Sequence, residues 1–463
     1  MPVVSATSKF APLGVLVAHC TLAFINGFTW ANYSPVPNQA KVVFDMTHTQ
    51  LNWLLASYTA VWIPAILPST MTQQRYGPVR TLLAASLLNL AGCALKLAAL
   101  LWFPNFWWCL LGQTLCGASE VFFLSLPPLL ASSWFDERHR GTVTAVASLS
   151  NSVGVALALG ITAPIVEATA DPRDGFRGIM IAQGALSLFS LLLVLLLPAA
   201  PAEAPSLTAS KPLPLSELVP AVKRLLRHRN FLLLVVAQAV FIQNLWTFDG
   251  IFVQAVQPFG VSQVDAGVMT SMFTIVGALG QFVMGKLVDR SRDPYPFIVG
   301  CYSASVGAIS VVSLAMAVAG DVTVAGYIAM PLLGVFALSS CPAVYEFVME
   351  VVYPIPAAAA LGINFMTPRV TLGTAMYQIA SALLTNHPTR DDGMKTVLFF
   401  LCALMAGSLV MIVGVRNERN RLAAEMAMDP ATEEWVATSL PPERSGLVQG
   451  TPTTTKSAEA PPV

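Results

Sequence analysis

The chain contains a series of apolar segments, each about twenty residues long, separated by short polar turns. The stretch from Trp108 to Val166 shows this pattern clearly: one apolar run ends at the charged residues 136–140, and a second apolar run returns. About 20 apolar residues in a helix cross the hydrocarbon core of a bilayer. Because lipid offers the backbone no hydrogen-bond partner, segments of this kind form helices. The sequence therefore predicts an all-α membrane protein.

The composition supports the same conclusion. Hydrophobic residues make up 55% of the 463 residues and charged residues 11%, whereas soluble domains carry about 25% charged residues. This length fits twelve spans joined by short loops. We place the spans near residues 11–34, 50–71, 79–102, 107–133, 141–166, 178–199, 230–256, 265–288, 296–318, 323–350, 356–385 and 394–415.

Lysine and arginine are distributed unevenly between the two sets of loops. Most of them, including Arg75, Arg138, Arg224 and Arg290, fall on the side that carries both termini. Basic residues mark cytoplasmic loops, so both termini are predicted to be cytoplasmic. We expect five regions: a cytoplasmic N-terminus (1–10), a first six-helix bundle (11–199), a cytoplasmic linker with a basic amphipathic helix (200–229), a second six-helix bundle (230–415) and a disordered cytoplasmic tail (416–463).

A few charged residues lie well inside the predicted spans rather than in the loops or at the very ends. An ionisable side chain inside a bilayer costs about 2.5–3.5 kcal/mol on insertion scales, so it indicates a functional site or a buried partner. Glu120, Asp249 and Arg369 lie near the middle of the membrane, and we consider both roles for each of them. Lys96 lies near the outer end of its span, where it is predicted to extend its ammonium group to the interface.

Several classes of function lack support in the sequence. No G-x-x-x-x-G-K-[ST] loop is present, which argues against ATP-driven pumping. We find no metal-ligand spacing, no catalytic nucleophile and no cofactor motif, so we expect neither an enzyme nor a nucleic-acid-binding protein. All seven cysteines lie in apolar stretches, which indicates packing thiols rather than disulfides.

The two halves show a weak internal repeat. The loop after the second span reads QRYGPVR, and the loop after the eighth reads GKLVDRSR. This plan of six plus six spans, with a Gly-x-x-x-Asp-Arg loop, resembles the major facilitator superfamily. The segments QLNWLLASYTAVWIPAILP, GQTLCGASEVFFLSLPPLLASSWF and YEFVMEVVYPIP are similar to the feline leukaemia virus subgroup C receptor-related family, solute carrier family 49. The resemblance covers nearly all of residues 15–415 and implies a transporter.

The resemblance also suggests which residues bind a substrate. Trp30 matches an aromatic position that helps to enclose the quaternary amine in choline-transporting relatives, and Trp246 matches a second one. Glu120, Ser152 and Arg369 stand where those relatives have glutamine. Asp249 lies three residues after Trp246, on the same side of a helix. Two aromatic faces suit a cation, whereas a belt of interfacial tryptophans is the alternative interpretation.

A second group of residues is predicted to act at the cytoplasmic gate. Glu346 and Glu350, one helical turn apart in YEFVME, match family glutamates. Asp289 and Arg290 belong to the basic loop after the eighth span. Carboxylates at the end of one span could accept bonds from the basic loops when the gate closes.

The sequence leaves several functions open. The first is a transporter, working by alternating access, for a small amine such as choline or ethanolamine. Haem is the alternative substrate, because Arg369 suits its propionates, and the resemblance adds a pyridoxine-like metabolite. A non-transporting receptor or scaffold is the alternative of another class. We expect a monomer in the plasma membrane, with an endolysosomal membrane as the alternative, and a small molecule and the lipid bilayer as partners.

Overall fold

The computed structural model describes residues 10–201, 215–318, 321–355, 357–385 and 388–428. Within these residues the chain is helical and contains no strand, which confirms the predicted fold class. The membrane-crossing helices of the first half are α1 (Ala11–Ala31), α3 (His48–Ala60), α4 (Trp62–Leu101), α5 (Phe106–Phe123), α6 (Pro127–Trp134), α7 (Arg140–Glu167) and α8 (Pro172–Leu196). Those of the second half are α10 (Arg229–Val256), α11 (Gln263–Ser291), α12 (Pro294–Val318), α13 (Thr323–Val352), α14 (Ala357–Thr367), α15 (Thr374–Leu384) and α16 (Arg390–Leu409).

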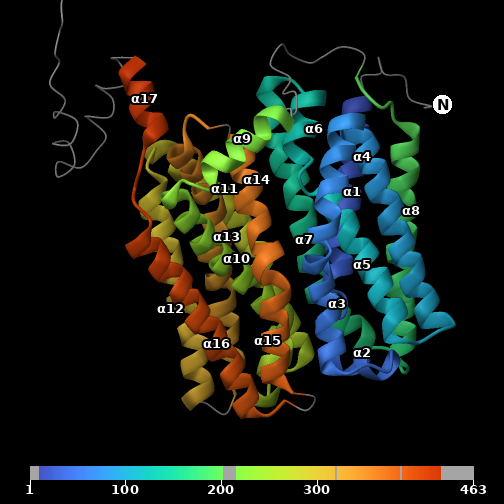
Figure 1. Ribbon diagram of the computed structural model, residues 1–463. Helices are drawn as coiled ribbons and strands as arrows, with labels where there is room; N and C mark the ends of the chain where they lie inside the picture. The colour runs from blue at the N-terminus through green and yellow to red at the C-terminus, as the bar shows by residue number, and fades with distance from the viewer. Residues whose placement is uncertain (1–9, 202–214, 319–320, 356, 386–387, 429–463) are drawn as a thin grey trace, which may run out of the picture.

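These helices form two groups that stand side by side (Figure 1). We call α1 to α8 the N-terminal bundle and α10 to α16 the C-terminal bundle. The shorter helices α2 (Pro37–Val43), α9 (Leu215–Leu225) and α17 (Asn420–Met428) lie outside the predicted spans. Helix α17 falls within the predicted tail, so that segment begins with a helix. The other predicted domain limits stay predictions.

Two of the predicted spans contain breaks that the sequence did not reveal. Helices α5 and α6 form one span bent by 44° just before Pro127. The eleventh span changes from α14 to a π-helical segment, η3 (Pro368–Gly373), and then continues as α15. Pro368 has no N–H group to donate to the preceding turn. A π-helical turn of this kind is often found at a functional site.

The loop predicted between the second and third spans is much shorter than expected. Helix α4 runs through it, and the direction of the chain changes at Gly77, which has a φ of 79°. Glycine adopts this backbone conformation without the steric cost that a Cβ atom would bring. Pro78 then starts the next span. Counting the segments before and after Gly77 separately, the described helices account for the twelve predicted spans.

Hydrogen bonds join the two bundles near their ends on the side opposite the termini. Gln254 on α10 donates its Nε2 hydrogen to Asn52 Oδ1 over 2.9 Å, and its Oε1 lies 3.2 Å from His48 Nδ1. Ser34 donates a hydrogen bond to the carbonyl oxygen of Gly250. Gln263 and Glu167 add a fourth contact, of 3.0 Å, between α11 and α7. The bundles are therefore sealed together on the side opposite the termini.

Candidate functional site

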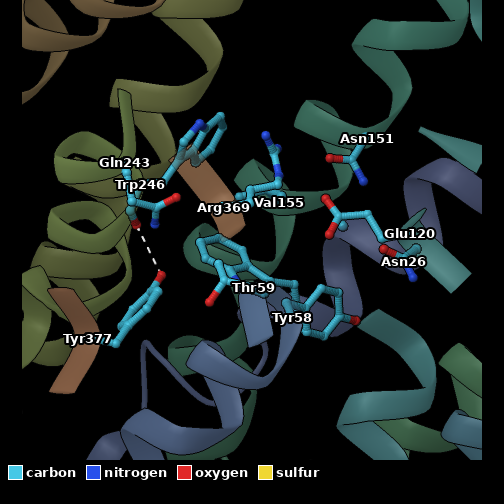
Figure 2. Close-up of a pocket in the computed structure, with 12 residues that line it drawn as sticks. Asn26, Tyr58, Thr59, Glu120, Asn151, Val155, Gln243, Trp246, Arg369 and Tyr377 are labelled. Carbon is cyan, nitrogen blue, oxygen red and sulfur yellow. Dashed lines mark hydrogen bonds between the residues drawn. The ribbon is translucent and has the colours of Figure 1, made fainter. Parts of the chain in front are cut away.

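A cavity of about 60 Å³ lies between the two bundles. By a similar measure a single water needs about 10–15 Å³, so the cavity has room for a handful of waters or one small solute. Figure 2 shows Asn26, Glu120 and Asn151 on one side and Gln243, Trp246 and Tyr377 on the other. The cavity is lined by Asn26, Gly27, Trp30, Tyr58, Thr59, Glu120, Asn151, Val155, Gln243, Trp246, Arg369 and Tyr377.

Two tryptophans from different bundles meet at this cavity. The rings of Trp30 on α1 and Trp246 on α10 have centroids 6.3 Å apart and an interplanar angle of 87°. In this edge-to-face arrangement the face of one ring is directed at the edge of the other. The structure thus places both predicted aromatic residues at the cavity rather than in an interfacial belt.

The cavity also contains one acid and one base, Glu120 and Arg369. Both side chains are half-buried, and they interact electrostatically without forming an ion pair within 4 Å. The Arg369 Cζ atom lies 4.4 Å from the ring centroid of Phe365 and 5.1 Å from that of Trp62. Segment η3 positions Arg369 between these rings, where cation–π attraction stabilises a positive charge.

Two predicted site residues do not line the cavity. On α7 the lining residues Asn151 and Val155 are one turn apart, whereas Ser152, rotated about 100° from Asn151, is not among the lining residues. Asp249 is fully buried next to Tyr377. Gly250, four residues after Trp246, lies on the same face of α10 as Trp246, and it approaches Leu55 of the N-terminal bundle.

Several lining residues were not predicted. Tyr377 donates its hydroxyl to the carbonyl oxygen of Trp246 over 3.2 Å (Figure 2). The Thr59 hydroxyl lies 3.1 Å from that of Thr374, and Asn151 donates to the carbonyl oxygen of Ala23 over 3.1 Å. The signal available in the sequence was the presence of polar residues in apolar spans. That signal does not distinguish a residue lining a cavity from one packed inside a bundle.

Lys96 forms a separate buried network inside the N-terminal bundle. Its Nζ donates to Gln113 Oε1 over 2.9 Å and to the carbonyl oxygen of Thr29 over 3.4 Å. Gln113 Nε2 donates to the carbonyl oxygens of Thr29 and Trp30, over 3.3 Å and 3.2 Å. The ammonium also lies 5.2 Å from the ring centroid of Tyr33. Lys96 has no exposed surface, so the prediction that it extends to the interface was wrong.

The predicted gating residues lie at the end of the C-terminal bundle that is predicted to face the cytoplasm. Arg421 on α17 contacts Glu350 over 2.9 Å and Glu346 over 3.2 Å. Asp289 lines a second cavity, of about 210 Å³, with these three residues, whereas Arg290 forms no ion pair in the part of the chain that is described. The partner of the two glutamates is therefore the segment after the last span rather than a loop between spans.

The buried thiols do not form a metal centre. All seven cysteines are free. Over the described ranges no group of three or more His, Cys, Asp or Glu side chains could hold a metal ion.

Comparisons with known proteins identify the fold. The family model described as "Major Facilitator Superfamily" matches residues 20–376. Solute carrier family 49 member A3 from Xenopus tropicalis is 25% identical over 91% of this chain and 90% of its own length. The human choline/ethanolamine transporter FLVCR2 is 23% identical over 92% of this chain and 82% of its own.

Solved structures support the same assignment. A bacterial homologue of the human lysosomal transporter Spinster, in an inward-facing and unoccupied conformation, aligns with a TM-score of 0.68 at 17% identity, over 87% of this chain and 98% of that one. A D-xylose–proton symporter aligns with a TM-score of 0.67 at 16% identity, over 88% and 98%. The predicted resemblance to solute carrier family 49 and the transporter function are confirmed. The chain belongs to the Major Facilitator Superfamily and is a multi-pass membrane transporter.

Proposed function

We propose that this transporter carries a small organic amine of the choline or ethanolamine class. The observation that carries the proposal is the edge-to-face pair of Trp30 and Trp246 at a cavity between the bundles. An aromatic face attracts a substituted ammonium group by about 0.5–2 kcal/mol. The similarity to choline/ethanolamine transporters over most of the chain supports the same substrate class.

The charges in the cavity fit this proposal when they are taken together. Glu120 supplies a carboxylate that favours a cation. Arg369 carries the opposite charge, but its guanidinium group packs on Phe365 and Trp62. Because Arg369 belongs to the C-terminal bundle and Glu120 to the N-terminal bundle, we assign to their attraction a role in holding the bundles together beside the substrate.

The contact between the two tryptophans argues against haem. A porphyrin would have to separate the rings of Trp30 and Trp246, whose centroids lie 6.3 Å apart. A pyridoxine-like metabolite is smaller and remains the second candidate, since Arg369 and Asn151 could bind its oxygen atoms. We further propose that the chain works as a monomer in the plasma membrane, with Glu346, Glu350 and Arg421 forming part of the cytoplasmic gate.

Uptake into proteoliposomes tests the proposal. Purified protein is offered radiolabelled choline, ethanolamine, pyridoxine and haem in parallel. We expect Trp246→Ala to lower choline uptake about tenfold, which corresponds to about 1.4 kcal/mol of lost binding. Trp107→Ala is the matched control, because Trp107 is an exposed tryptophan at the start of α5 and does not line the cavity. Uptake that falls equally in both variants, or uptake of haem alone, would overturn the proposal.

Arg369→Gln separates the two roles of the arginine. If Arg369 only helps to hold the bundles, choline uptake is kept or raised in this variant. Arg177→Gln, which removes an exposed arginine that pairs with Asp174, is the control. Loss of pyridoxine uptake in Arg369→Gln, with no choline uptake in the wild type, would make the arginine a substrate ligand instead.

A further inference from the structure

Asp249 is a buried acid that the transport site described above does not use. It lies on α10, one turn beyond Trp246, and it has no exposed surface. Neither of its carboxylate oxygens has a hydrogen-bond partner among the described residues. An ionised carboxylate in this position would lose its hydration without compensation, whereas a protonated carboxyl group is neutral. The surroundings of Asp249 therefore favour the protonated form in this conformation.

The titratable neighbour of Asp249 is Tyr377 on α15. No charged side chain from the other helices packed against α10 interacts with Asp249 within the described ranges. Tyr377 also lines the cavity and interacts electrostatically with Glu120 on its far side. The Tyr377 hydroxyl donates to the carbonyl oxygen of Trp246 and lies beside Gly250, so it sits at the cavity next to the turn of α10 that carries Asp249.

The same turn of α10 forms part of the seal between the bundles. The residue after Asp249 is Gly250, whose carbonyl oxygen accepts a hydrogen bond from Ser34. One turn further, Gln254 bonds to Asn52 over 2.9 Å. When the bundles separate on the outer side, both contacts must break. That movement would uncover this turn of α10 and allow water to reach Asp249.

We propose that Asp249 is a proton-binding site that couples the transport cycle to a transmembrane pH gradient. With the outer side open, the ionised carboxylate takes a proton from outer water. The neutral acid is then buried as the seal between Gly250 and Ser34 forms, so proton binding favours the closed outer side. With the cytoplasmic side open, the proton leaves past Tyr377 to water in the cavity. This inference rests on the proposed transport of a small amine.

A pH-gradient experiment tests the coupling. Proteoliposomes containing the full chain are given radiolabelled choline with an acidic outer medium. We expect the wild type to accumulate choline above its equilibrium level, and Asp249→Asn to accumulate none. Exchange of internal for external choline should stay within about twofold of the wild type, because Asp249 does not line the cavity. Asp174→Asn, at an exposed ion pair, is the control.

Two results would overturn the proposal while leaving amine transport standing. One is wild-type uptake that ignores the pH gradient. The other is an Asp249→Asn variant that responds to the gradient as the wild type does. If the wild type transports none of the amines, the proposed function fails. Infrared spectroscopy then tests separately whether the Asp249 carboxyl group is protonated. A protonated carboxyl band at neutral pH that disappears in Asp249→Asn supports the site, and the absence of such a band rejects it.

Discussion

Among the described residues, each bundle contains one Asp, Glu, Lys or Arg with no exposed surface, and the surroundings of these two residues differ greatly. In the N-terminal bundle, Lys96 donates hydrogen bonds to Gln113 and to the carbonyl oxygen of Thr29. In the C-terminal bundle, Asp249 has no hydrogen-bond partner in the described part of the chain. Both side chains are completely covered. The difference suggests that Lys96 stabilises the fold, whereas Asp249 acts in a step of the transport cycle.

The position of Lys96 explains why a membrane protein can retain it. Helix α1 ends at Ala31, and the last carbonyl groups of a helix have no partner within it. These carbonyls carry the negative end of the helix dipole, which favours a cation. Lys96 and Gln113 bind the carbonyl oxygens of Thr29 and Trp30. The network therefore fixes the end of α1, and with it the backbone that carries Trp30.

The largest effect in this comparison is expected from Lys96→Met. Methionine keeps the length of the side chain but leaves Gln113 Oε1 without its donor and removes one of the two donors to the carbonyl oxygen of Thr29. A hydrogen bond to a charged group contributes about 1.5–3 kcal/mol, so we expect unfolding to become easier by about 2–3 kcal/mol. Thermal unfolding in detergent measures this against Lys395→Met, which changes an exposed lysine. Equal melting temperatures for the two variants would show that the Lys96 network is dispensable.

Gly112→Ala probes the space that Lys96 needs. A Cβ atom at Gly112 would lie 2.7 Å from Lys96 Cγ and 2.8 Å from the backbone oxygen of Gly92. The helices α4 and α5 would have to move apart, at a cost of about 1–3 kcal/mol. Gly184→Ala is the matched control, because a Cβ atom there meets nothing within 4 Å. If both variants melt alike, the close packing around Lys96 does not contribute to stability.

The opposite result is expected at Asp249. The carboxyl group makes no hydrogen bond that asparagine would lose, so Asp249→Asn should change the free energy of unfolding by less than about 1 kcal/mol. The same thermal assay, run beside Lys96→Met, measures it. A loss as large as that of Lys96→Met would mean that Asp249 has a structural partner, and the contrast between the bundles would disappear.

The sequence predicted the membrane spans and much of the cavity, because both depend on strong local signals. Apolar runs located the helices, and Trp30, Glu120, Trp246 and Arg369 were selected as rare residues within them. All four line the cavity. Their selection needed the family resemblance as well as the chemistry, since an aromatic residue in a span is often an interfacial residue.

The sequence predicted less well wherever the outcome depends on contacts between helices. Lys96 was misplaced because its partners, Gln113 and Thr29, come from two other helices. Ser152 and Asp249 were expected in the cavity because spacing along one helix does not say where its neighbours pack. The pairing of Glu346 with Arg421 was missed for a similar reason, since a segment beyond the last span supplies the arginine.

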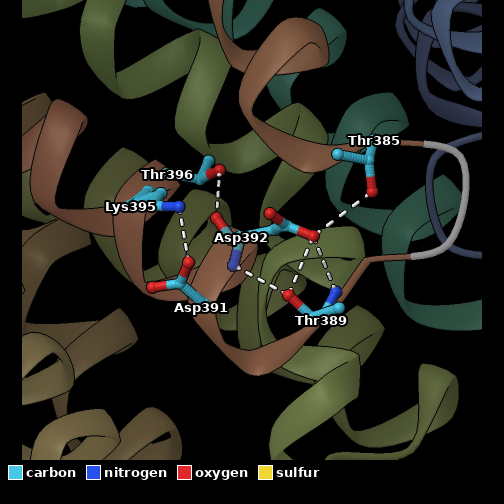
Figure 3. A network of polar contacts seen from close by, with 6 residues as sticks. All are labelled: Thr385, Thr389, Asp391, Asp392, Lys395 and Thr396. Carbon is cyan, nitrogen blue, oxygen red and sulfur yellow. Dashed lines mark hydrogen bonds and ion pairs between the residues drawn. The ribbon is translucent and has the colours of Figure 1, made fainter.

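The smallest effect should come from a charged group outside the membrane, Asp392 at the start of α16. Thr389 donates to the Asp392 carboxylate from its N–H over 3.0 Å and from its hydroxyl over 2.9 Å (Figure 3). These hydrogen bonds hold the pKa of Asp392 below its ordinary value of 3.8. Because the folded-state pKa is lowered, the stabilisation is complete above the unfolded value and is lost as the pH falls through the folded value.

The stability difference between the wild type and Asp392→Asn should therefore be constant near neutral pH and disappear in acid. Melting temperatures measured across that range test it. Asp391→Asn is the control, because Asp391 contacts Lys395 over 2.5 Å instead of capping the helix (Figure 3). Lys96→Met should show no such loss in acid, since an ammonium stays charged there. If the effects of Lys96→Met and Asp392→Asn both disappeared in acid, the distinction between them would be contradicted. That distinction is between a buried cation with permanent partners and an exposed acid that water can screen.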